Sequence, residues 1–591
     1  MPMLKDPSEK YDGYEPIDIP DRTWPTQVTR KAPIWLSTDL RDGNQALQTP
    51  MNVEQKLELF DLLVSVGFKE IEVAFPPASE TEFTFVRRLI EEKRIPDGVA
   101  IQVMTPARRD CISRTFDAIR GAKRVIVQLY NATAPIFRDI VFQSTKEDII
   151  KLAVEHTHVV RALAIEYERI YGTVFQLCYG IEGFTQSEPD FVIDVCSRIK
   201  DAWDSHGPSP TKIIFNLPST VECAPANHFA DQVEYFCRNI PKREEVLVCL
   251  HAHNDRGTAV SATELGLLAG ADRVDGCLLG NGERTGNVDL IILALNLYTQ
   301  GIPPHLDFSD LGKIVESISR LTALPVHPRH PYSGSLVFTA FSGGHQDGIR
   351  KGLVRRAENP AQKWRVPYLP VDPSDFGFVY RPVRINSQSG RGGITYLLEQ
   401  AFRFTIPRPM QADFYKTVQN MCDTEGRELA VSEIIAAFCH KYHFSPPAKV
   451  EELDRPVEIA SRVALDSFTT FQEGPDEPVR FEGTLSVDHR DDAVCGRADE
   501  VHSAIGYALA RTLAVEFVVM AKYIEPLAEG RGAAGYVRLG LEKETAGSQA
   551  GWWGVGVGCC IEEATARAIV SASNVALDQV SAEMGCCRKG F

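Results

Sequence analysis

Hydrophobic and polar positions alternate along the first half of the chain in a way that predicts strands followed by helices. Residues 34–40 form an apolar run typical of a buried strand. Asn52 is a good N-cap, residues 53–66 place apolar side chains at helical spacing, and Gly67 follows as a helix-ending glycine. Residues 70–75 then have the pattern of a second strand. This strand–helix–strand order predicts a parallel sheet.

The same alternation continues to about residue 280. Amphipathic helices are expected over residues 190–203, 230–239 and 258–268. The remaining strands are expected to end near Met104, Tyr130, Tyr179, Leu217, Leu250 and Leu279. Eight strands, each followed by a helix, over roughly 250 residues predict an α/β fold of the (β/α)8 TIM-barrel type. A doubly wound open sheet is the alternative, but no Gly-x-Gly-x-x-Gly follows the first strand to favour it.

Candidate metal ligands follow two of these strands. His251 and His253 are two residues apart at the end of a strand, so their imidazoles point to the same side. A single His-x-His pair is more often structural than metal-binding. Arg41 and Asp42, after the first strand, strengthen the case, because two imidazoles and one carboxylate form an open site for a divalent metal.

Other polar residues also follow strands, where a barrel collects its chemistry at the C-terminal mouth. Glu182 follows the fifth strand, Thr220 the sixth, and the sequence GNGERTGN at residues 280–287 the eighth. Each has a simpler explanation, since a carboxylate or threonine often caps a helix and glycine-rich turns are common. Their position after successive strands predicts that they meet at one rim.

Composition narrows the class of protein. The chain has 591 residues, 44% of them hydrophobic and 24% charged, which is typical of a soluble globular protein. A net charge of -16 argues against general nucleic-acid binding. The sequence has no apolar run of about twenty residues, and its polar N-terminus resembles neither a secretory signal nor a transit peptide. The 14 cysteines form no Cys-x-x-Cys pair, so we expect reduced thiols and a cytoplasmic location.

Changes in composition predict four segments: an N-terminal extension (1–30), the barrel (31–320), linker subdomains (321–455) and a small α+β domain (456–591). Proline and glycine are frequent from residue 321 to about 409, and helices are expected over 413–421 and 431–440. A weak internal repeat of strands and a helix follows. The strands are expected over 479–487, 536–541 and 552–558, and the helices over 500–513 and 562–575.

Four motifs together carry a family resemblance. They are LRDGNQ at residues 40–45, HxHNDRG at 251–257, GNGERTGN at 280–287 and SGGHQD at 342–347. In this order and spacing they resemble the long form of the 2-isopropylmalate synthase family, from about Trp24 to the C-terminus. The related citramalate and homocitrate synthases share the barrel motifs. The resemblance implies an acyltransferase that condenses acetyl-CoA with a 2-oxo acid and then hydrolyses the thioester to give a 2-substituted malate.

The resemblance also assigns roles to single residues. It adds Asn287 to the metal ligands Asp42, His251 and His253, and zinc, magnesium or manganese could occupy the site. Arg41 would stabilise the developing alkoxide, and Glu182 would hold a water or the substrate. His345, with Tyr380, is the candidate base for acetyl-CoA. In the family this histidine reaches the partner subunit's barrel, which implies a homodimer with interlocked linkers. His345 at the start of a helix over residues 346–353 is the simpler explanation.

The remaining assignments concern the two substrates. The resemblance places four residues around the oxo acid: Met104, Gln128, Gly180 and Thr220. It places the glycine-rich loop beside coenzyme A, through Gly280, Asn281, Gly282, Glu283 and Arg284. No membrane or nucleic-acid partner is expected.

This chain departs from the family at two pocket positions. Gln128 stands where the family has a histidine, and Gly180 where it has a serine. We therefore predict a bulkier oxo acid than 2-oxoisovalerate, such as 4-hydroxyphenylpyruvate, in specialised metabolism. The alternatives are a genuine 2-isopropylmalate synthase of leucine biosynthesis and an inactive paralogue that binds a metabolite or partner. A metal-dependent hydrolase would leave the C-terminal half unexplained. The family's Gly-Asn-Gly-Pro segment is also replaced around residues 495–499, so we expect weak or no inhibition by leucine.

Overall fold

The structure is a computed structural model that falls into two compact units. It describes residues 4, 6–11, 13–207, 209–378, 385–386, 389–446, 450, 453, 455–474, 477–488, 490–513, 517–527, 532–541 and 551–587. The first unit comprises Met1–Val337 and Val371–Val379, and the second comprises Phe338–Pro370 and Tyr380–Phe591. Each unit is described by itself.

The first unit contains a closed barrel of eight parallel strands, each hydrogen-bonded to the next in chain order. The strands are β1 (Ile34–Ser37), β2 (Glu70–Ala74), β3 (Ala100–Pro106), β4 (Arg124–Ala132), β5 (Val174–Glu182), β6 (Ile213–Ser219), β7 (Val246–Ala252) and β8 (Arg273–Gly276). The ring closes where β1 pairs with β8, with Ile34 opposite Arg273 and Ser37 opposite Gly276. The predicted TIM barrel is confirmed.

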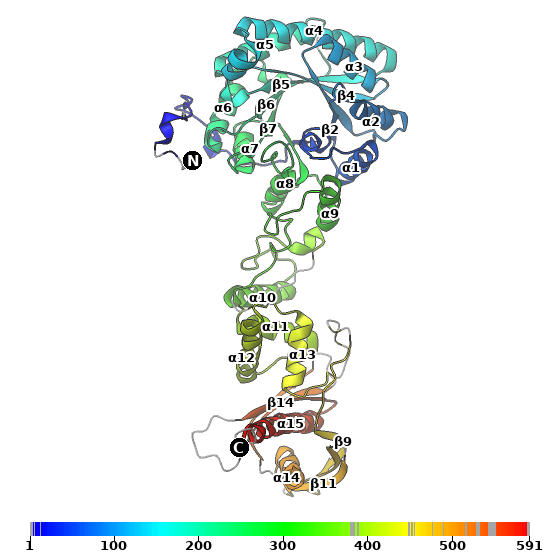
Figure 1. Cartoon of the computed structure of the whole chain (residues 1–591), viewed down its shortest axis with the longest axis vertical. Helices are drawn as coiled ribbons and strands as arrows, with labels where there is room; N and C mark the ends of the chain where they lie inside the picture. Colours follow the sequence, from blue (N-terminus) through cyan, green and yellow to red (C-terminus); the bar gives the residue numbers. More distant parts are fainter. Residues whose placement is uncertain are drawn as a thin grey trace. The chain divides into compact units, whose positions relative to one another are not determined.

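Helices surround the barrel on its outside (Figure 1). They are α1 (Val53–Val66), α2 (Glu80–Glu91), α3 (Arg109–Ile119), α4 (Lys146–Tyr171), α5 (Pro189–Asp204), α6 (Ala226–Asn239), α7 (Ala259–Leu268) and α8 (Leu290–Thr299), followed by α9 (Leu311–Thr322). The local sequence explains their ends well in the case of α1. Asn52 and Gln55 form a reciprocal capping box, and Gly67 takes the left-handed conformation with φ 109°.

Two strands end earlier than their apolar runs predict. The first was expected to reach residue 40, but β1 ends at Ser37 and the chain turns into a π-helical segment, η3 (Asp39–Gly43). The carbonyl of Thr38 accepts hydrogen bonds from the N–H groups of three residues in this turn, at 2.9–3.2 Å. Leu40 is fully buried inside the turn, which explains why the sequence stays apolar beyond the strand. Similarly, β8 ends at Gly276, before Leu279.

The second unit combines helices with two three-stranded antiparallel sheets. Its first helices are α10 (Gly343–Glu358), α11 (Arg391–Phe402), α12 (Arg408–Glu425) and α13 (Val431–Lys441). One sheet has the order β11-β10-β9 and the other β12-β13-β14. These strands are β9 (Val463–Phe471), β10 (Val479–Val487), β11 (Arg490–Ala498), β12 (Phe517–Pro526), β13 (Ala533–Leu541) and β14 (Trp552–Gly558), with helices α14 (Val501–Leu513) and α15 (Ile561–Cys587).

The expected repeat is present, but it is larger than predicted. The strands β10, β13 and β14 and both helices lie where the sequence indicates, whereas β9, β11 and β12 were not predicted. These three strands are the outer or more exposed ones, with many polar side chains in solvent. Among the described residues, no helix is long and apolar enough to cross a membrane.

Candidate metal centre and active site

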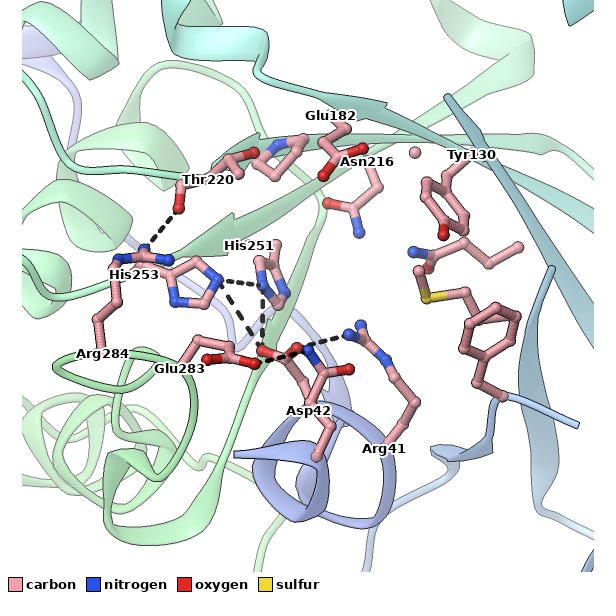
Figure 2. Close-up of a pocket in the computed structure, with 16 residues that line it drawn as sticks. Arg41, Asp42, Tyr130, Glu182, Asn216, Thr220, His251, His253, Glu283 and Arg284 are labelled. Carbon is pink, nitrogen blue, oxygen red and sulfur yellow. Dashed lines mark hydrogen bonds and ion pairs between the residues drawn. The ribbon is translucent and has the colours of Figure 1, made fainter. Parts of the chain in front are cut away.

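Three buried side chains from opposite ends of the barrel sequence meet at its mouth. Asp42 comes from η3, and His251 and His253 come from the end of β7 (Figure 2). The Oδ2 atom of Asp42 lies 3.6 Å from Nε2 of His251 and 3.9 Å from Nε2 of His253. The two Nε2 atoms are 3.2 Å apart. One potential ligand atom from each residue thus lies within 4.8 Å of the other two.

Two neighbouring side chains hold this group in place. Oδ2 of Asp275, on β8, lies 3.1 Å from Nδ1 of His251 and leaves Nε2 facing Asp42. The amide of Asn287 donates a hydrogen bond to Asp42 Oδ2 at 2.8 Å, while its buried Oδ1 atom has no hydrogen-bond partner among the described residues. Two imidazole nitrogens, one carboxylate and one unsatisfied amide oxygen are a set of ligands that fits a divalent metal.

The neighbouring charges keep the Asp42 carboxylate ionised beside the two imidazoles. Burial alone would raise the pKa of Asp42, but Arg41 and the two histidines outweigh it and lower that pKa. Burial and the neighbouring His251 lower the pKa of His253 to about 4. For His251, the carboxylates of Asp275 and Asp42 outweigh burial, so its pKa is raised. An ionised aspartate beside a neutral His253 is the state that binds a cation.

Arg41 is salt-bridged on both sides and still reaches the pocket. Its Nη1 donates to Asp42 Oδ1 at 2.6 Å, and its Nε donates to Glu72 Oε2 at 2.8 Å. A guanidinium has five N–H donors and these bonds use two of them, so others remain for an anion in the cavity. The residue is buried, with an exposed fraction of 8%. Arg41 can therefore stabilise negative charge next to the metal group.

A chain of buried amides connects Arg41 with the oxo-acid side of the pocket. Glu72 accepts a hydrogen bond from Gln102 Nε2 at 3.1 Å, and the same nitrogen donates to Gln128 Oε1 at 2.7 Å. Arg273 Nη2 donates to Gln102 Oε1 at 2.8 Å, which fixes the orientation of that amide. Gln128 Oε1 is thus an acceptor, and its NH2 group faces Gly180.

The space next to Gly180 is already occupied. A Cβ atom on Gly180 would lie 3.2 Å from Tyr130 Cβ and 3.4 Å from Gln128 Nε2. The absence of a serine side chain here therefore does not leave an open hole, because Tyr130 and the longer amide of Gln128 fill it. The change from serine to glycine therefore adds less space to the pocket than residue size alone indicates.

A single cavity of about 380 Å³ contains most of the predicted site. Of the residues predicted from the sequence, it is lined by Arg41, Asp42, Met104, Gln128, Gly180, Glu182, Thr220, His251, His253, Glu283 and Arg284. Burial raises the pKa of Glu182. The hydroxyl of Thr220 accepts a hydrogen bond from the N–H of Gly183 at 2.9 Å, so its own proton is available to a ligand. Figure 2 shows Glu182 and Thr220 on one side of the pocket and Asp42 and Arg41 on the opposite side.

The glycines after β8 pack around Asn287. Gly282 has φ +151°, and a Cβ atom there would lie 2.3 Å from Asn287 Nδ2. Gly280 has φ +70°, and the carbonyl of Asn281 accepts a hydrogen bond from the Asn287 amide at 2.9 Å. Gly280, Asn281 and Gly282 are not among the residues that line the cavity. Glycine is needed in this loop because the loop packs closely against Asn287, a candidate metal ligand.

Of the two candidate residues for proton abstraction, the structure describes one. His345 belongs to the second unit, in the first turn of α10, where it is exposed and stacks on Tyr368 with ring centroids 4.1 Å apart. This position fits the simpler explanation of a histidine at the start of a helix, although the helix begins at Gly343, three residues earlier than predicted. Tyr380 lies outside the described residues.

Sequence reasoning missed the residues that orient the site from inside the barrel. Glu72, Gln102 and Asp275 lie within strands, not after them, and all three are fully buried. A signal for them does exist. A charged or amide side chain inside an apolar strand of a parallel sheet has no solvent face to occupy, so it needs polar partners in the core.

Two known families match segments of this chain. Residues 32–318 match the HMGL-like family, and residues 335–399 match the family described as alpha-isopropylmalate synthase, post-catalytic domain-like. Among solved structures, hydroxymethylglutaryl-CoA lyase from Pseudomonas aeruginosa is similar, with 19% identity, a TM-score of 0.40, and coverage of 50% of this chain and 94% of that one.

Full-length relatives carry a consistent name. The 2-isopropylmalate synthase of Azotobacter vinelandii is 46% identical over 98% of this chain and 99% of its own length. That of Ralstonia nicotianae is 45% identical over 97% and 95%, and that of Schizosaccharomyces pombe is 45% identical over 96% of both chains. With this identity along its whole length, the chain belongs to the 2-isopropylmalate synthase family of acyl-CoA-condensing transferases.

Proposed function

We propose that this protein condenses acetyl-CoA with 2-oxoisovalerate to give 2-isopropylmalate. The condensation of acetyl-CoA with a 2-oxo acid follows from the family. The observation that carries the proposal is the group Asp42, His251 and His253 beside Arg41 in one cavity. A bound cation and the Arg41 guanidinium, placed side by side, would stabilise the negative charge that forms on a ketone oxygen when a carbon nucleophile attacks.

The residues of the cavity divide the work. A divalent metal held by Asp42, His251, His253 and Asn287 would polarise the ketone of the oxo acid. Arg41 stabilises the negative charge that develops on the ketone oxygen. Thr220 donates its hydroxyl proton to the carboxylate of the oxo acid, and Glu182 holds a water or the substrate. His345, assisted by Tyr380, removes a proton from the methyl group of acetyl-CoA.

The proposed oxo acid is the small branched one for a structural reason. The amide of Gln128 and the Cβ atom of Tyr130 lie close to the position that a side chain on residue 180 would take. Gln102 holds Gln128 in this position at 2.7 Å. The bulkier oxo acid expected from the two substitutions thus gains little room at Gly180, and the names of the full-length relatives fit 2-oxoisovalerate.

An arylpyruvate is the second candidate. Gln128 and Gly180 line the same cavity, together with Met104. The NH2 group of Gln128 is a donor that the family's usual aliphatic substrate cannot use, whereas the phenol of 4-hydroxyphenylpyruvate can accept from it. This observation favours a polar aromatic substrate for specialised metabolism.

Steady-state kinetics with both oxo acids decides between the candidates. We expect kcat/KM for 2-oxoisovalerate to exceed that for 4-hydroxyphenylpyruvate, measured by release of free coenzyme A and by mass identification of the product. The variant Gln128→His/Gly180→Ser restores the family's residues and serves as the matched control. A higher kcat/KM for the arylpyruvate, reversed in the double variant, would establish the second candidate. No turnover with any oxo acid would indicate the inactive paralogue.

We further propose that zinc or manganese occupies the metal site in preference to magnesium. Two of its four ligands are imidazoles, which magnesium seldom accepts, because it favours oxygen donors. Treatment with a chelator followed by addition of each metal, with activity and bound metal measured together, tests this order. Full activity with magnesium alone would contradict it.

We propose that the active form is a homodimer with interlocked linkers, in which the partner subunit supplies His345. Four large apolar side chains after β4 are 50–70% exposed, as expected of a surface that another subunit covers: Ile136, Ile140, Val141 and Phe142. Mixing inactive Asp42→Ala and His345→Ala proteins should restore about a quarter of the activity, since statistical exchange gives half heterodimers with one intact site each. No recovery after verified exchange would place His345 in its own subunit's site.

We also propose a cytoplasmic location. All cysteines whose side chains the structure describes are free thiols, which suits a reducing compartment. Cell fractionation with antibody detection tests this location.

A further inference from the structure

A hollow of about 130 Å³ in the second unit is lined by four cationic side chains and no anionic one. Arg355 and Arg356 belong to the last turn of α10. Lys363 and Arg365 belong to the segment that follows this helix. At about 30 Å³ for each water, the hollow has room for roughly four waters or one tetrahedral anion.

The segment after α10 is held tightly against the helix by two glycines. A Cβ atom on Gly352 would lie 2.6 Å from Pro367 Cδ, and one on Gly348 would lie 3.0 Å from a ring carbon of Tyr368. Trp364 Nε1 donates to the carbonyl of Leu369 at 2.7 Å, and apolar residues on both sides form one small core. The backbone that carries Lys363 and Arg365 is therefore held beside the end of the helix, and both side chains are exposed to a ligand from solvent.

The positive charge of the hollow is not neutralised. In the first half of α10, Asp347 pairs with Arg350 at 3.3 Å and with Lys351 at 2.5 Å. For the four cations of the hollow, the described part of the chain provides no ion pair, although Arg356 donates to the carbonyl of Gln362. The helix macrodipole explains arginines in the last turn, but it does not explain Lys363 and Arg365.

We propose that this hollow binds a phosphate monoester, and that the 3′-phosphate of acetyl-CoA is its source. Arginine binds phosphate oxygens in a forked arrangement, and lysine adds a point charge. The proposal rests on the proposed function, in which acetyl-CoA is the reactant that carries phosphate. A free phosphate compound is the other source of the same chemistry.

The position of the candidate base supports acetyl-CoA. His345, Gly348, Gly352 and Arg356 are spaced by three or four residues, so they lie along one face of α10. Pro367 and Tyr368 cover this face between the two ends, so a ligand would run over that segment. Arg356 follows His345 by eleven positions, which corresponds to ~16 Å along a helix. A long molecule can thus present its acetyl group near His345 and its phosphate near the hollow.

Kinetics with acetyl-CoA and acetyl-3′-dephospho-CoA tests the proposal in the full-length, metal-loaded enzyme. Removal of the 3′-phosphate should raise KM about tenfold in the unaltered protein, as expected for a charge-assisted contact. The double variant Lys363→Gln/Arg365→Gln should raise KM for acetyl-CoA by a similar factor and bring the ratio of the two KM values to about one. KM for the oxo acid and kcat should not change.

The variant Lys351→Gln is the matched control, because it removes an exposed cation from the same helix outside the hollow. It should leave both KM values unchanged. A double variant that folds and still discriminates between the two thioesters would overturn the proposal.

Calorimetry without turnover separates this proposal from the proposed function. Coenzyme A should bind about tenfold more tightly than 3′-dephospho-CoA, and the double variant should abolish the difference. If both bind equally while inorganic phosphate binds only to the unaltered protein, the source is a free phosphate compound and the assignment to acetyl-CoA is wrong. If every oxo acid fails in kinetics while calorimetry shows the difference, the hollow still binds coenzyme A and the proposed function has failed.

Discussion

At the scale of the residue, Glu72 is the acceptor that organises the floor of the cavity. It is fully buried and accepts hydrogen bonds from Arg41, Gln102 and the hydroxyl of Thr38. A buried carboxylate with three donors fixes the direction in which each donor points. Glu72 thereby fixes the Arg41 guanidinium at the wall of the cavity, while Glu72 itself is not among the residues that line it.

We expect Glu72→Gln to reduce kcat about 10- to 100-fold, because the neutral amide no longer holds the Arg41 guanidinium by charge. It should also lower the free energy of unfolding by ~1–3 kcal/mol. Turnover measurements and denaturant unfolding check both values. The control is Glu70→Gln on the same strand, which loses the ion pair to Arg273 at 2.6 Å but has no contact with Arg41. Equal losses of kcat in both variants would count against a positioning role for Glu72.

Glu182 links stability and activity through its raised pKa. Burial raises this pKa above 4.5, so the folded protein binds a proton more tightly than the unfolded chain between 4.5 and the raised value. Folding stability contributed by this group therefore falls as pH rises through that interval. In the metal-free protein, Glu182→Gln should increase Tm at pH 8 more than at pH 4, while kcat decreases. Thermal unfolding at both pH values checks this, and an equal increase at both would contradict it.

At the scale of the element, the backbone conformation of the loop after β8 determines where the side chain of Asn287, a proposed metal ligand, lies. Gly282→Ala should weaken metal affinity at least tenfold, because the new methyl group would displace the Asn287 amide. Titration of the metal-free protein with zinc measures the affinity. Gly257→Ala is the control, since Gly257 has φ +76° with no atom within 4 Å of an added Cβ, so it carries backbone strain alone. Similar affinities in both variants would show that contact with Asn287 is unimportant.

The elements that could be predicted from sequence are those with strong local signals. Asn52 and Gly67 mark both ends of α1, and the apolar runs of the barrel strands have no competing explanation. The strands β11 and β12 could not be predicted, because most of their side chains face solvent and only the sheet gives them a pattern. Long-range pairing determines these strands more than propensity does.

The same distinction applies to the site. Asp42, His251 and His253 could be predicted because the barrel places residues after strands at one mouth. Gln102 could not, since its partners Glu72, Gln128 and Arg273 come from three other strands. The space at Gly180 could not be judged from sequence either, because residue size indicates volume only when the neighbouring side chains are known.

At the scale of the whole molecule, the second unit contains the C-terminal domain, which bears on whether leucine inhibits the enzyme. The long form of the family binds leucine in its C-terminal domain, and here the segment around residues 495–499, part of β11, differs from the family. We expect leucine to inhibit weakly or not at all, with less than half of the activity lost at millimolar concentration. Initial rates across a leucine series measure this, and half-maximal inhibition at micromolar leucine would refute it.

The pairing of β1 with β8 has a consequence for how the protein is made in the cell. Asp42 follows the first strand, whereas both histidines and Asn287 belong to the last two strand–loop segments. A growing polypeptide on the ribosome therefore contains only one of the four proposed metal ligands until more than 250 residues have been translated. Chains that end before β7 lack both imidazoles and Asn287, so the metal site proposed above would form only in chains that complete the ring.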